Sequence, residues 1–505
     1  MPRLSRLAGT TALALVLGTG LARADVTPAQ VWDDMQQYLE GFGYQVTATE
    51  STAGNTLRLD GLTITMPIPD PKGTVTVNVD GMALTDLGDG TVSIDLPASL
   101  PMHFSVEAEG LKPVSGMVTY SLQNMRAILS GDPDHLVTTM SADSIGLSLD
   151  EITASAQTLG PDNFKVNLTF SGLDGTSTMV KGDTGRDFDQ SGKIATFAYD
   201  LDIQPPEETG RLKVNGQLAD MAYAFTGMVP AQVDLADMAA ALAAGFAIDG
   251  HYTYGASAAQ FSFEDGRDQM EGSGSATNGR FGVTMNKDRL AYSAGASDAR
   301  FDAVGSSLPL PVMAKMAEAL FDLSIPLQPG DDPQDFSLAI KLGGFETSDL
   351  LWSMFDVGGV LPRDPATIDL AVSGKAKVLI NVMGPQMGMR PGPPAELEQL
   401  TVDRLHVEAA GAKVTGTGAF TFDNSDMQSF DGFPRPEGMV DLAVAGANGL
   451  MDKLVQMGLL PEQQAMGARM MLGMFTVPGD GPDNLTSHIE INDQGQVLAN
   501  GQRLK

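Results

Sequence analysis

The sequence predicts a mainly β protein with several helices. We expect an extended, largely antiparallel and curved sheet system, two-layered or groove-like, with short helices packed on it. Apolar and polar residues alternate with a period of two over most of the first half of the chain, as in strands that bury one face. Glycine, asparagine and aspartate separate these segments, where hairpins need turns. Several apolar segments of the second half follow the helical period instead.

The first 24 residues have the features of a signal peptide. Arg3 and Arg6 form a short basic region, and Leu7–Leu21 is apolar but shorter than the ~20 residues that span a bilayer. Ala22-Arg23-Ala24 is a small-x-small cleavage site, as signal peptidase requires. We therefore expect cleavage after residue 24 and an exported, periplasmic mature chain without an integral membrane segment.

Composition excludes several classes of function. The 505 residues include no cysteine, which removes thiolate nucleophiles, disulfides and cysteine–zinc sites. They include 31 Lys plus Arg and 63 Asp plus Glu, a net charge of -32. Loss of the signal peptide would remove three arginines and no acid, so the mature chain would carry 28 minus 63, or -35. Such a surface repels phosphate backbones, so we expect no nucleic acid partner.

We divide the mature chain into an N-terminal antiparallel β-rich region, residues 25–226, and a C-terminal β-rich region, residues 227–505. The first region opens with a helix, because Thr27 is a suitable N-cap and Pro28 suits the first helical position. Strands joined by short turns follow it. In the second region we expect helices near 233–246, 310–322, 348–357 and 447–475, the last a helical hairpin.

The C-terminal segment 487–505 has the pattern of a β-hairpin. Ile489 and Ile491 alternate with polar residues, and Val497 begins the return strand. Asn500-Gly501 then supplies a second tight turn. Nothing in this segment suggests catalysis.

Two segments carry a family resemblance: "LLWSMFDVGGVLPRDPATIDLAVSG" and "LLPEQQAMGARMMLGMFTVPGDGPDNLTSHIEINDQGQVLANGQRL". They resemble the domain of unknown function 2125 family of exported bacterial proteins, over nearly all of the mature chain. The resemblance implies a periplasmic protein and assigns no catalytic residue. The closing "INDQGQVLANGQRL" is also similar, at the level of fold, to the ends of envelope proteins related to the AsmA group. Those proteins are linked with lipid movement between membranes.

No catalytic motif is present, so we expect no enzymatic activity and no cofactor. The five histidines form no HxxxH or HExxH pattern, and the chain has neither a GxSxG elbow nor a Walker A loop. With 63 acidic residues, a hydrolase that uses an unrecognised carboxylate pair stays open as an alternative.

One acidic segment has the spacing of a calcium loop. Asp187, Asp189, Ser191 and Gly192 take positions one, three, five and six of an EF-hand-like pattern, but Ala198 stands where a bidentate glutamate belongs. We therefore predict an ordinary acidic turn.

Methionine is abundant, with 28 residues, and some of them lie at helical spacing. Met466, Met470 and Met474 share one face of a helix, which suits adaptable apolar contacts. The residues that we expect to line a ligand site are Leu350, Trp352, Phe355, Leu454, Met457, Met466, Met470 and Met474.

The sequence thus favours a non-enzymatic periplasmic envelope protein. Its expected partner is an apolar small molecule, a lipid or another envelope protein. The main alternative is Cu(I) binding by the thioethers of Met383, Met387 and Met389, although packing explains this cluster better.

Overall fold

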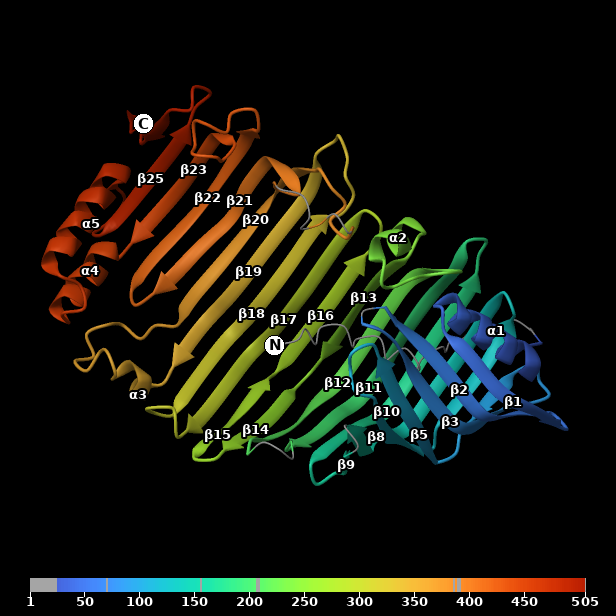
Figure 1. Cartoon of the computed structure of the whole chain (residues 1–505). Helices are drawn as coiled ribbons and strands as arrows, with labels where there is room; N and C mark the ends of the chain where they lie inside the picture. Colours follow the sequence, from blue (N-terminus) through green and yellow to red (C-terminus); the bar gives the residue numbers. More distant parts are fainter. Residues whose placement is uncertain are drawn as a thin grey trace. The chain divides into compact units, whose positions relative to one another are not determined.

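The computed structural model describes residues 25–69, 71–154, 157–205, 209–384, 387 and 392–504. The predicted signal peptide lies outside these ranges. The chain divides into two compact units, residues 1–269 and 270–505. Strands make up 63% of the structure and helices 10%, which confirms the predicted mainly β fold with several helices (Figure 1).

The strands of the first unit are β1 Gln45–Ala53, β2 Thr56–Pro69, β3 Lys72–Asp86, β4 Val92–Asp95, β5 Ser99–Ala108, β6 Val114–Gln123, β7 Arg126–Asp132, β8 His135–Ala154, β9 Gln157–Leu159, β10 Phe164–Lys181, β11 Gly185–Ile203, β12 Arg211–Pro230, β13 Ala247–Tyr254 and β14 Ser257–Asp265. Its helices are α1 Pro28–Gly41 and α2 Met238–Ala243.

The strands of the second unit are β15 Asp268–Ala276, which begins just before the division, β16 Asn278–Met285, β17 Arg289–Gly305, β18 Val312–Pro326, β19 Gln334–Thr347, β20 Ala366–Val378, β21 Ala395–Ala409, β22 Ala412–Asp423, β23 Arg435–Ala445, β24 Val477–Pro478, β25 Asn484–Ile491, β26 Val497–Ala499 and β27 Gln502–Arg503. Its helices are α3 Asp349–Trp352, α4 Ala447–Gln456 and α5 Glu462–Phe475.

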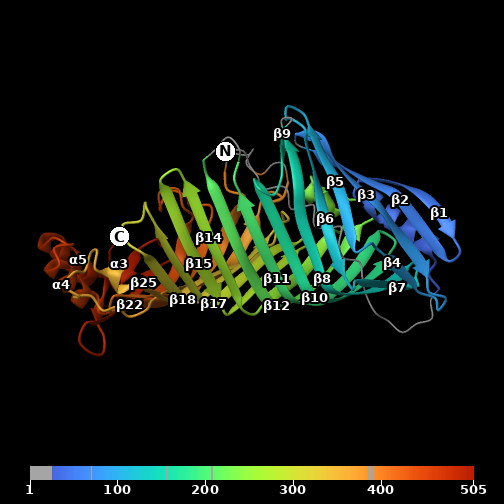
Figure 2. The same cartoon turned by 90° about the horizontal axis from the view of Figure 1, so that it is seen from below.

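The sheet of the first unit is an antiparallel meander with one irregular region. Pairing runs from β1 through β2 to β3 and, at the other side, from β8 through β10 and β11 to β12 (Figure 2). Two strand pairs lie between β3 and β8: β5 with β6, and β4 with β7. β3 contacts both β4 and β5, and β8 contacts both β6 and β7.

β4 and β5 form one long interrupted strand, and β6 and β7 form another. The two interruptions lie next to each other in the sheet. The first is interrupted between β4 and β5, at residues 96–98, where Pro97 can donate no ladder hydrogen bond. The second is interrupted between β6 and β7, where Asn124 has a φ of 51°, a conformation that asparagine tolerates better than most residues. The paired interruption leaves Leu96 and Met125 outside the ladders. Leu96 packs against the largest cluster of buried residues, and Met125 packs against a second cluster that includes Ala127 and Met140.

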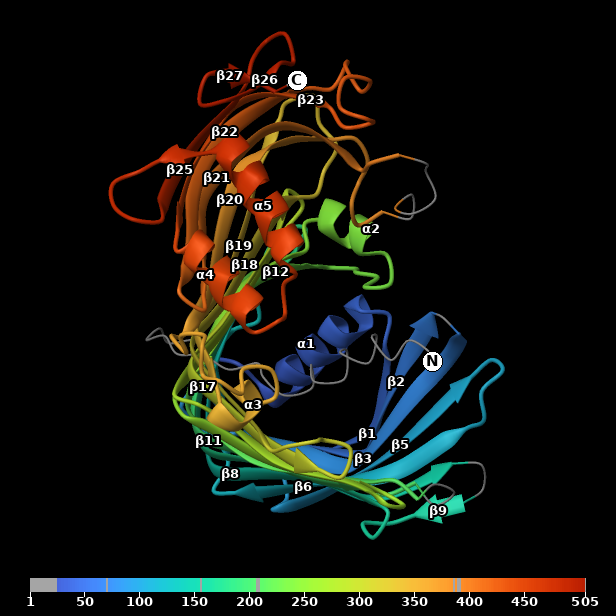
Figure 3. The same cartoon turned by 90° about the vertical axis from the view of Figure 1, so that its left-hand side faces the viewer.

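Helix α1 confirms the first predicted element. The Thr27 hydroxyl accepts a hydrogen bond from the Gln30 amide, and the Gln30 side chain accepts one from the Thr27 amide, which is a capping box. Val31 and Trp32 are each 1% exposed, and the Trp32 indole N–H donates to Glu50 at 2.8 Å. The helix lies inside the curve of the sheet of its own unit (Figure 3).

The second unit is one antiparallel sheet in nearly sequential order. Pairing runs from β16 through β17, β18, β19, β20, β21, β22 and β23 to β25, and then to β26 and β27. The pairing of β25 with β26, and the left-handed Asn500 and Gly501 before β27, confirm the predicted C-terminal hairpin and its second turn. The predicted hairpin of helices is also confirmed, as α4 and α5.

Three predictions differ from the structure. Residues 312–322 of the predicted helix 310–322 lie in β18, because ladders with β17 and β19 on both sides outweigh the few tenths of a kcal/mol per residue by which Met, Ala and Glu favour a helix. The calcium-like segment lies within β11, not in a turn, because residues 185–203 pair continuously with β12 apart from one position. The suggested boundary after residue 226 falls inside β12, which is continuous there.

Two of the other expected helices exist but are shorter than predicted. The helix near 233–246 is α2, which begins after the Asp237 cap, and the helix near 348–357 is α3, which begins after the Ser348 cap. Among the described residues, no helix has both the length and the apolar character needed to cross a membrane.

Candidate functional site

The sheet of the second unit has one almost entirely apolar face. Directly paired residues lie on the same face, so the register defines rows that cross eight strands from β17 to β25 (Figure 1). Three adjacent rows are Tyr292–Leu323–Leu338–Val372–Val402–Gly418–Val440–Ile489, Ala294–Phe321–Ile340–Leu370–Leu405–Gly416–Leu442–Ser487 and Ala296–Ala319–Leu342–Ile368–Val407–Val414–Val444–Leu485. We call these three rows the apolar face.

Large side chains on the apolar face are open to solvent. Tyr292, Phe321, Leu342, Ile368 and Val407 are 37–48% exposed. A sheet normally buries its apolar face against another layer. With strands about 4.8 Å apart, seven spacings give the face a length of about 34 Å, which is long for an exposed apolar surface on a monomeric protein.

The opposite face of the same sheet is polar. Asp369 there is bonded to Arg404 at 2.8 Å, and Glu318 to Lys341 at 2.5 Å. Leu320 lies in the same row as Lys341 and Asp369, although its neighbour Phe321 belongs to the apolar face. The two faces therefore differ in chemistry along the same strands.

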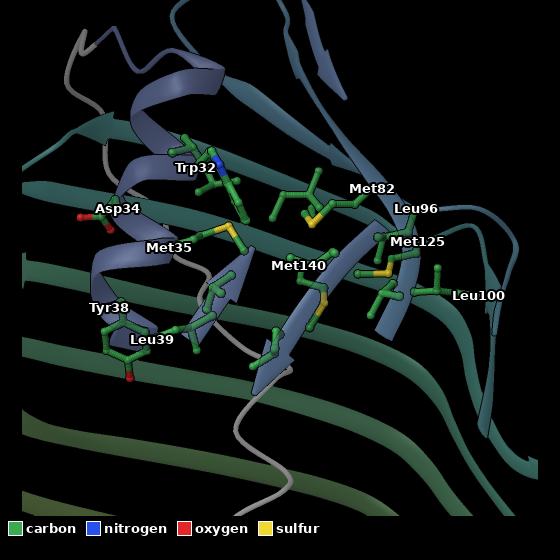
Figure 4. Close-up of a pocket in the computed structure, with 18 of the residues that line it drawn as sticks. Trp32, Asp34, Met35, Tyr38, Leu39, Met82, Leu96, Leu100, Met125 and Met140 are labelled. Atoms are coloured by element: carbon green, nitrogen blue, oxygen red, sulfur yellow. The ribbon is translucent and has the colours of Figure 1, made fainter. Parts of the chain in front are cut away.

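The first unit contains a partly open, apolar cavity of about 270 Å³. It lies between α1 and the region where the inner strands break, and Figure 4 shows Met35 and Leu39 of α1 on one side and Leu96, Leu100 and Met125 on the other. The lining residues are Val31, Trp32, Asp34, Met35, Tyr38, Leu39, Val46, Leu62, Ile64, Val79, Met82, Ile94, Leu96, Leu100, Met102, Tyr120, Leu122, Met125, Ala127, Leu129, Leu136, Met140, Ile145 and Met179.

The cavity wall carries little charge. Burial raises the pKa of Tyr38, against the opposing effect of the Arg186 guanidinium, and burial also raises the pKa of Tyr120. Both phenols therefore stay neutral at pH 7. Asp34 is the single carboxylate among the lining residues, and it is bonded to Arg186.

An ion pair attaches α1 to the sheet at the edge of the cavity. Asp34 Oδ2 lies 2.6 Å from Arg186 Nη1 on β11, and the two side chains are 12% and 11% exposed. The guanidinium also lies over the Tyr38 ring, 5.7 Å from its centroid, and close to the sulfur of Met179. This contact joins segments that are 152 residues apart.

The residues that the sequence suggested as ligand-lining lie elsewhere, in the second unit. Leu350, Trp352 and Phe355 belong to α3 and the turn after it, and the Trp352 and Phe355 rings are 5.0 Å apart. The other five lie on or directly after α4 and α5, at the β25 end of this unit (Figure 1). Met466, Met470 and Met474 are more than half exposed. None of the eight lines the cavity.

The methionines of the copper alternative are only partly described. Met383 is half-buried and Met387 is 48% exposed, while Met389 lies outside the described residues. In the described ranges, no cluster of three or more His, Asp or Glu side chains is placed to hold a metal ion.

A second, more polar pocket of about 620 Å³ lies in the second unit and includes Asp288 and Asp335. A hydrolase would need these carboxylates to converge on a substrate. Each contacts a lysine instead, Lys287 and Lys375, at 2.7 Å.

Sequence reasoning missed both the cavity and the apolar face. The alternation of apolar residues in β17 to β25 was visible, but the register that aligns them in rows was not. The residues that line the cavity come from positions between 31 and 179 of the sequence. Pro97 and Asn124, which interrupt otherwise regular strand patterns, were the only local features that could have indicated it.

Comparison with known proteins gives one match. Residues 240–504 match the family described as "Uncharacterized protein conserved in bacteria (DUF2125)", whereas no curated protein and no solved structure matches the chain. The matched residues include the apolar face but not the cavity. The match is therefore shorter than the resemblance implied, which was nearly all of the mature chain. Because it spans more than half of the 505 residues, the chain belongs to the DUF2125 family of uncharacterized proteins conserved in bacteria.

Proposed function

We propose that this protein is a non-enzymatic, exported envelope protein that binds the apolar chains of lipids. The observation that carries the proposal is the apolar face, three rows of eight residues in which five large side chains are 37–48% exposed. Because exposed apolar area is unfavourable in water, a surface of this kind marks a site where an apolar partner binds.

The composition of the apolar face favours a flexible lipid chain over a protein as the bound partner. Protein interfaces carry about one hydrogen bond per 100–200 Å². Among the twenty-four positions of the three rows, Tyr292 and Ser487 alone have a hydrogen-bonding side chain. The apolar face is about 34 Å long. An acyl chain that spans one leaflet of a 30 Å hydrocarbon core is ~15 Å long, so the face is long enough to hold it.

The cavity of the first unit supports the same class of ligand. Its walls are apolar, and a volume of about 270 Å³ is close to the lower limit of roughly 300 Å³ for ligand pockets. The basic and apolar segments of residues 1–24 support export to the periplasm, where the ligand would be an envelope lipid.

Lipid retention by matched variants tests the proposal. Purified protein is incubated with vesicles of zwitterionic phospholipid, chosen because the net charge of -32 repels anionic headgroups. It is then separated from the vesicles and extracted for mass spectrometry. We expect wild-type protein to retain phospholipid, Phe321→Asp to lose most of it, and Leu320→Asp to retain it.

The Phe321 and Leu320 variants introduce the same charge at adjacent positions of β18 but on opposite faces. Circular dichroism and melting temperature establish that both are folded. Equal retention by the two variants, or no lipid on the wild-type protein, would overturn the proposed role of the apolar face.

A further inference from the structure

Three buried hydroxyl groups of the described chain have no hydrogen-bond partner: Thr138 Oγ1, Ser177 Oγ and Tyr223 Oη. Thr138 and Ser177 are 0% and 1% exposed, and they pair directly across β8 and β10. Buried hydroxyls almost always find a partner, so two unpartnered neighbours in one ladder are unusual.

Thr138 and Ser177 project from the face that forms the cavity wall. Residues two apart in a strand share a face, and Leu136 and Met140, on either side of Thr138, line the cavity. Met179 does the same beside Ser177. Neither residue is among those that line the cavity. Because their side chains are shorter than those of these neighbours, the two hydroxyls lie behind the lining, beside the flexible methionines Met140 and Met179, which can move aside.

The Tyr223 hydroxyl approaches from β12, in the row of the sheet next to that of Thr138 and Ser177. Its ring lies across Gly192 and Gly175: a Cβ on Gly192 would be 2.5 Å from Tyr223 Oη, and one on Gly175 would be 2.9 Å from it. Gly175 is two residues from Ser177, about 7 Å along β10, and directly opposite Met140. The two glycines thus leave room for a phenol that extends along this row towards Met140, which lines the cavity, while Ser177 lies in the neighbouring row.

The three groups suit an uncharged polar ligand group. A hydroxyl can both donate and accept a hydrogen bond, so the cluster matches an alcohol or an ester. The nearest cation identified at the cavity, Arg186, is paired with Asp34, so a carboxylate on the ligand would be buried without its own counter-charge, which is costly.

The size of the cavity indicates one chain rather than two. At about 270 Å³, it is nearly twice the roughly 150 Å³ of an apolar cavity that binds benzene. We propose that Thr138, Ser177 and Tyr223 bind the polar end of an uncharged single-chain amphiphile, a long-chain alcohol or ester, whose apolar chain occupies this cavity. The inference rests on the proposed function and names the ligand class for the first unit.

Decanol and decane are the probes that test this inference. Trp32 lines the cavity, and the chain has two tryptophans, so a Trp352→Phe background makes Trp32 emission the binding signal. We expect Thr138→Val with Ser177→Ala to weaken decanol binding roughly tenfold, from the loss of two hydrogen bonds. Decane affinity should stay unchanged.

The control is Thr176→Val, which removes a hydroxyl from the opposite face of β10 and should change neither affinity. Tyr223→Phe removes a single oxygen, so it tests the cluster even where the double variant fails to fold, with an expected loss of about threefold for decanol.

The outcomes separate the two proposals. If wild-type protein binds decane and decanol and the variants leave both affinities unchanged, the hydroxyls are satisfied by ordered water and the inference is wrong. If wild-type protein binds neither probe, the proposed binding function of this cavity fails as well.

Discussion

The ion pair between Asp34 and Arg186 should hold α1 over the cavity. Asp34→Asn keeps the shape of the side chain but removes its charge, which leaves Arg186, 11% exposed, without a counter-charge. Removing one partner of a buried pair costs about 3–5 kcal/mol. Since 1.4 kcal/mol is tenfold in an equilibrium constant, local opening of α1 should increase by roughly 10² to 4 × 10³.

Native-state hydrogen exchange of the α1 amides measures this opening directly. Asp33→Asn is the matched control: Asp33 is the adjacent residue but is exposed, so its variant should change the opening free energy by less than about 0.5 kcal/mol. Because both side chains are only 11–12% exposed, 1 M salt should reproduce little of the effect in wild-type protein. Equal exchange rates in Asp34→Asn and Asp33→Asn would refute the reasoning.

Three further predictions concern single positions. Asp483 accepts hydrogen bonds from the first turn of α4, and although burial raises its pKa, these bonds outweigh burial and lower it. Asp483→Ala should therefore destabilise the second unit by about 0.5–2 kcal/mol in thermal unfolding at pH 7. In wild-type protein this contribution is present above the unfolded-state pKa of about 3.9 and is lost as the pH falls through the lower folded-state pKa; an equal penalty at pH 2 would contradict it. Gly192→Ala places a Cβ 2.5 Å from Tyr223 Oη and 2.7 Å from the Asp174 carbonyl oxygen, so urea unfolding should show a loss of about 1–3 kcal/mol, and an unchanged midpoint would disprove the close approach. Ala127→Leu fills part of the cavity, so decane binding should fall while the melting temperature is maintained; retained affinity would place the probe elsewhere.

Local signals in the sequence predicted most of the secondary structure. The capping residues Thr27 and Gln30 act within one turn, so α1 could be predicted from its own residues. The turn Asn500-Gly501 and the helical hairpin α4–α5 depend on equally short-range preferences. The family resemblance was likewise visible in linear segments, and its extent, residues 240–504, came from comparison.

Local propensity failed where ladders on both sides decided the conformation. Residues 310–322 have the composition of a helix, but β17 and β19 satisfy both edges of β18, and two ladders of hydrogen bonds outweigh a few tenths of a kcal/mol per residue. The same reason places Asp187, Asp189 and Ser191 in a strand.

The sequence by itself determined that this protein is strand-rich, acidic, cysteine-free and without a recognisable catalytic motif. Only the tertiary structure decided where its apolar residues meet. Rows such as Phe321–Ile340–Leu370 depend on register, and a shift of one residue would turn each side chain to the other face. The cavity depends on strand breaks that bring Met125 near Met35 and on an ion pair across 152 residues. Such contacts are set by long-range pairing, which a local pattern does not encode.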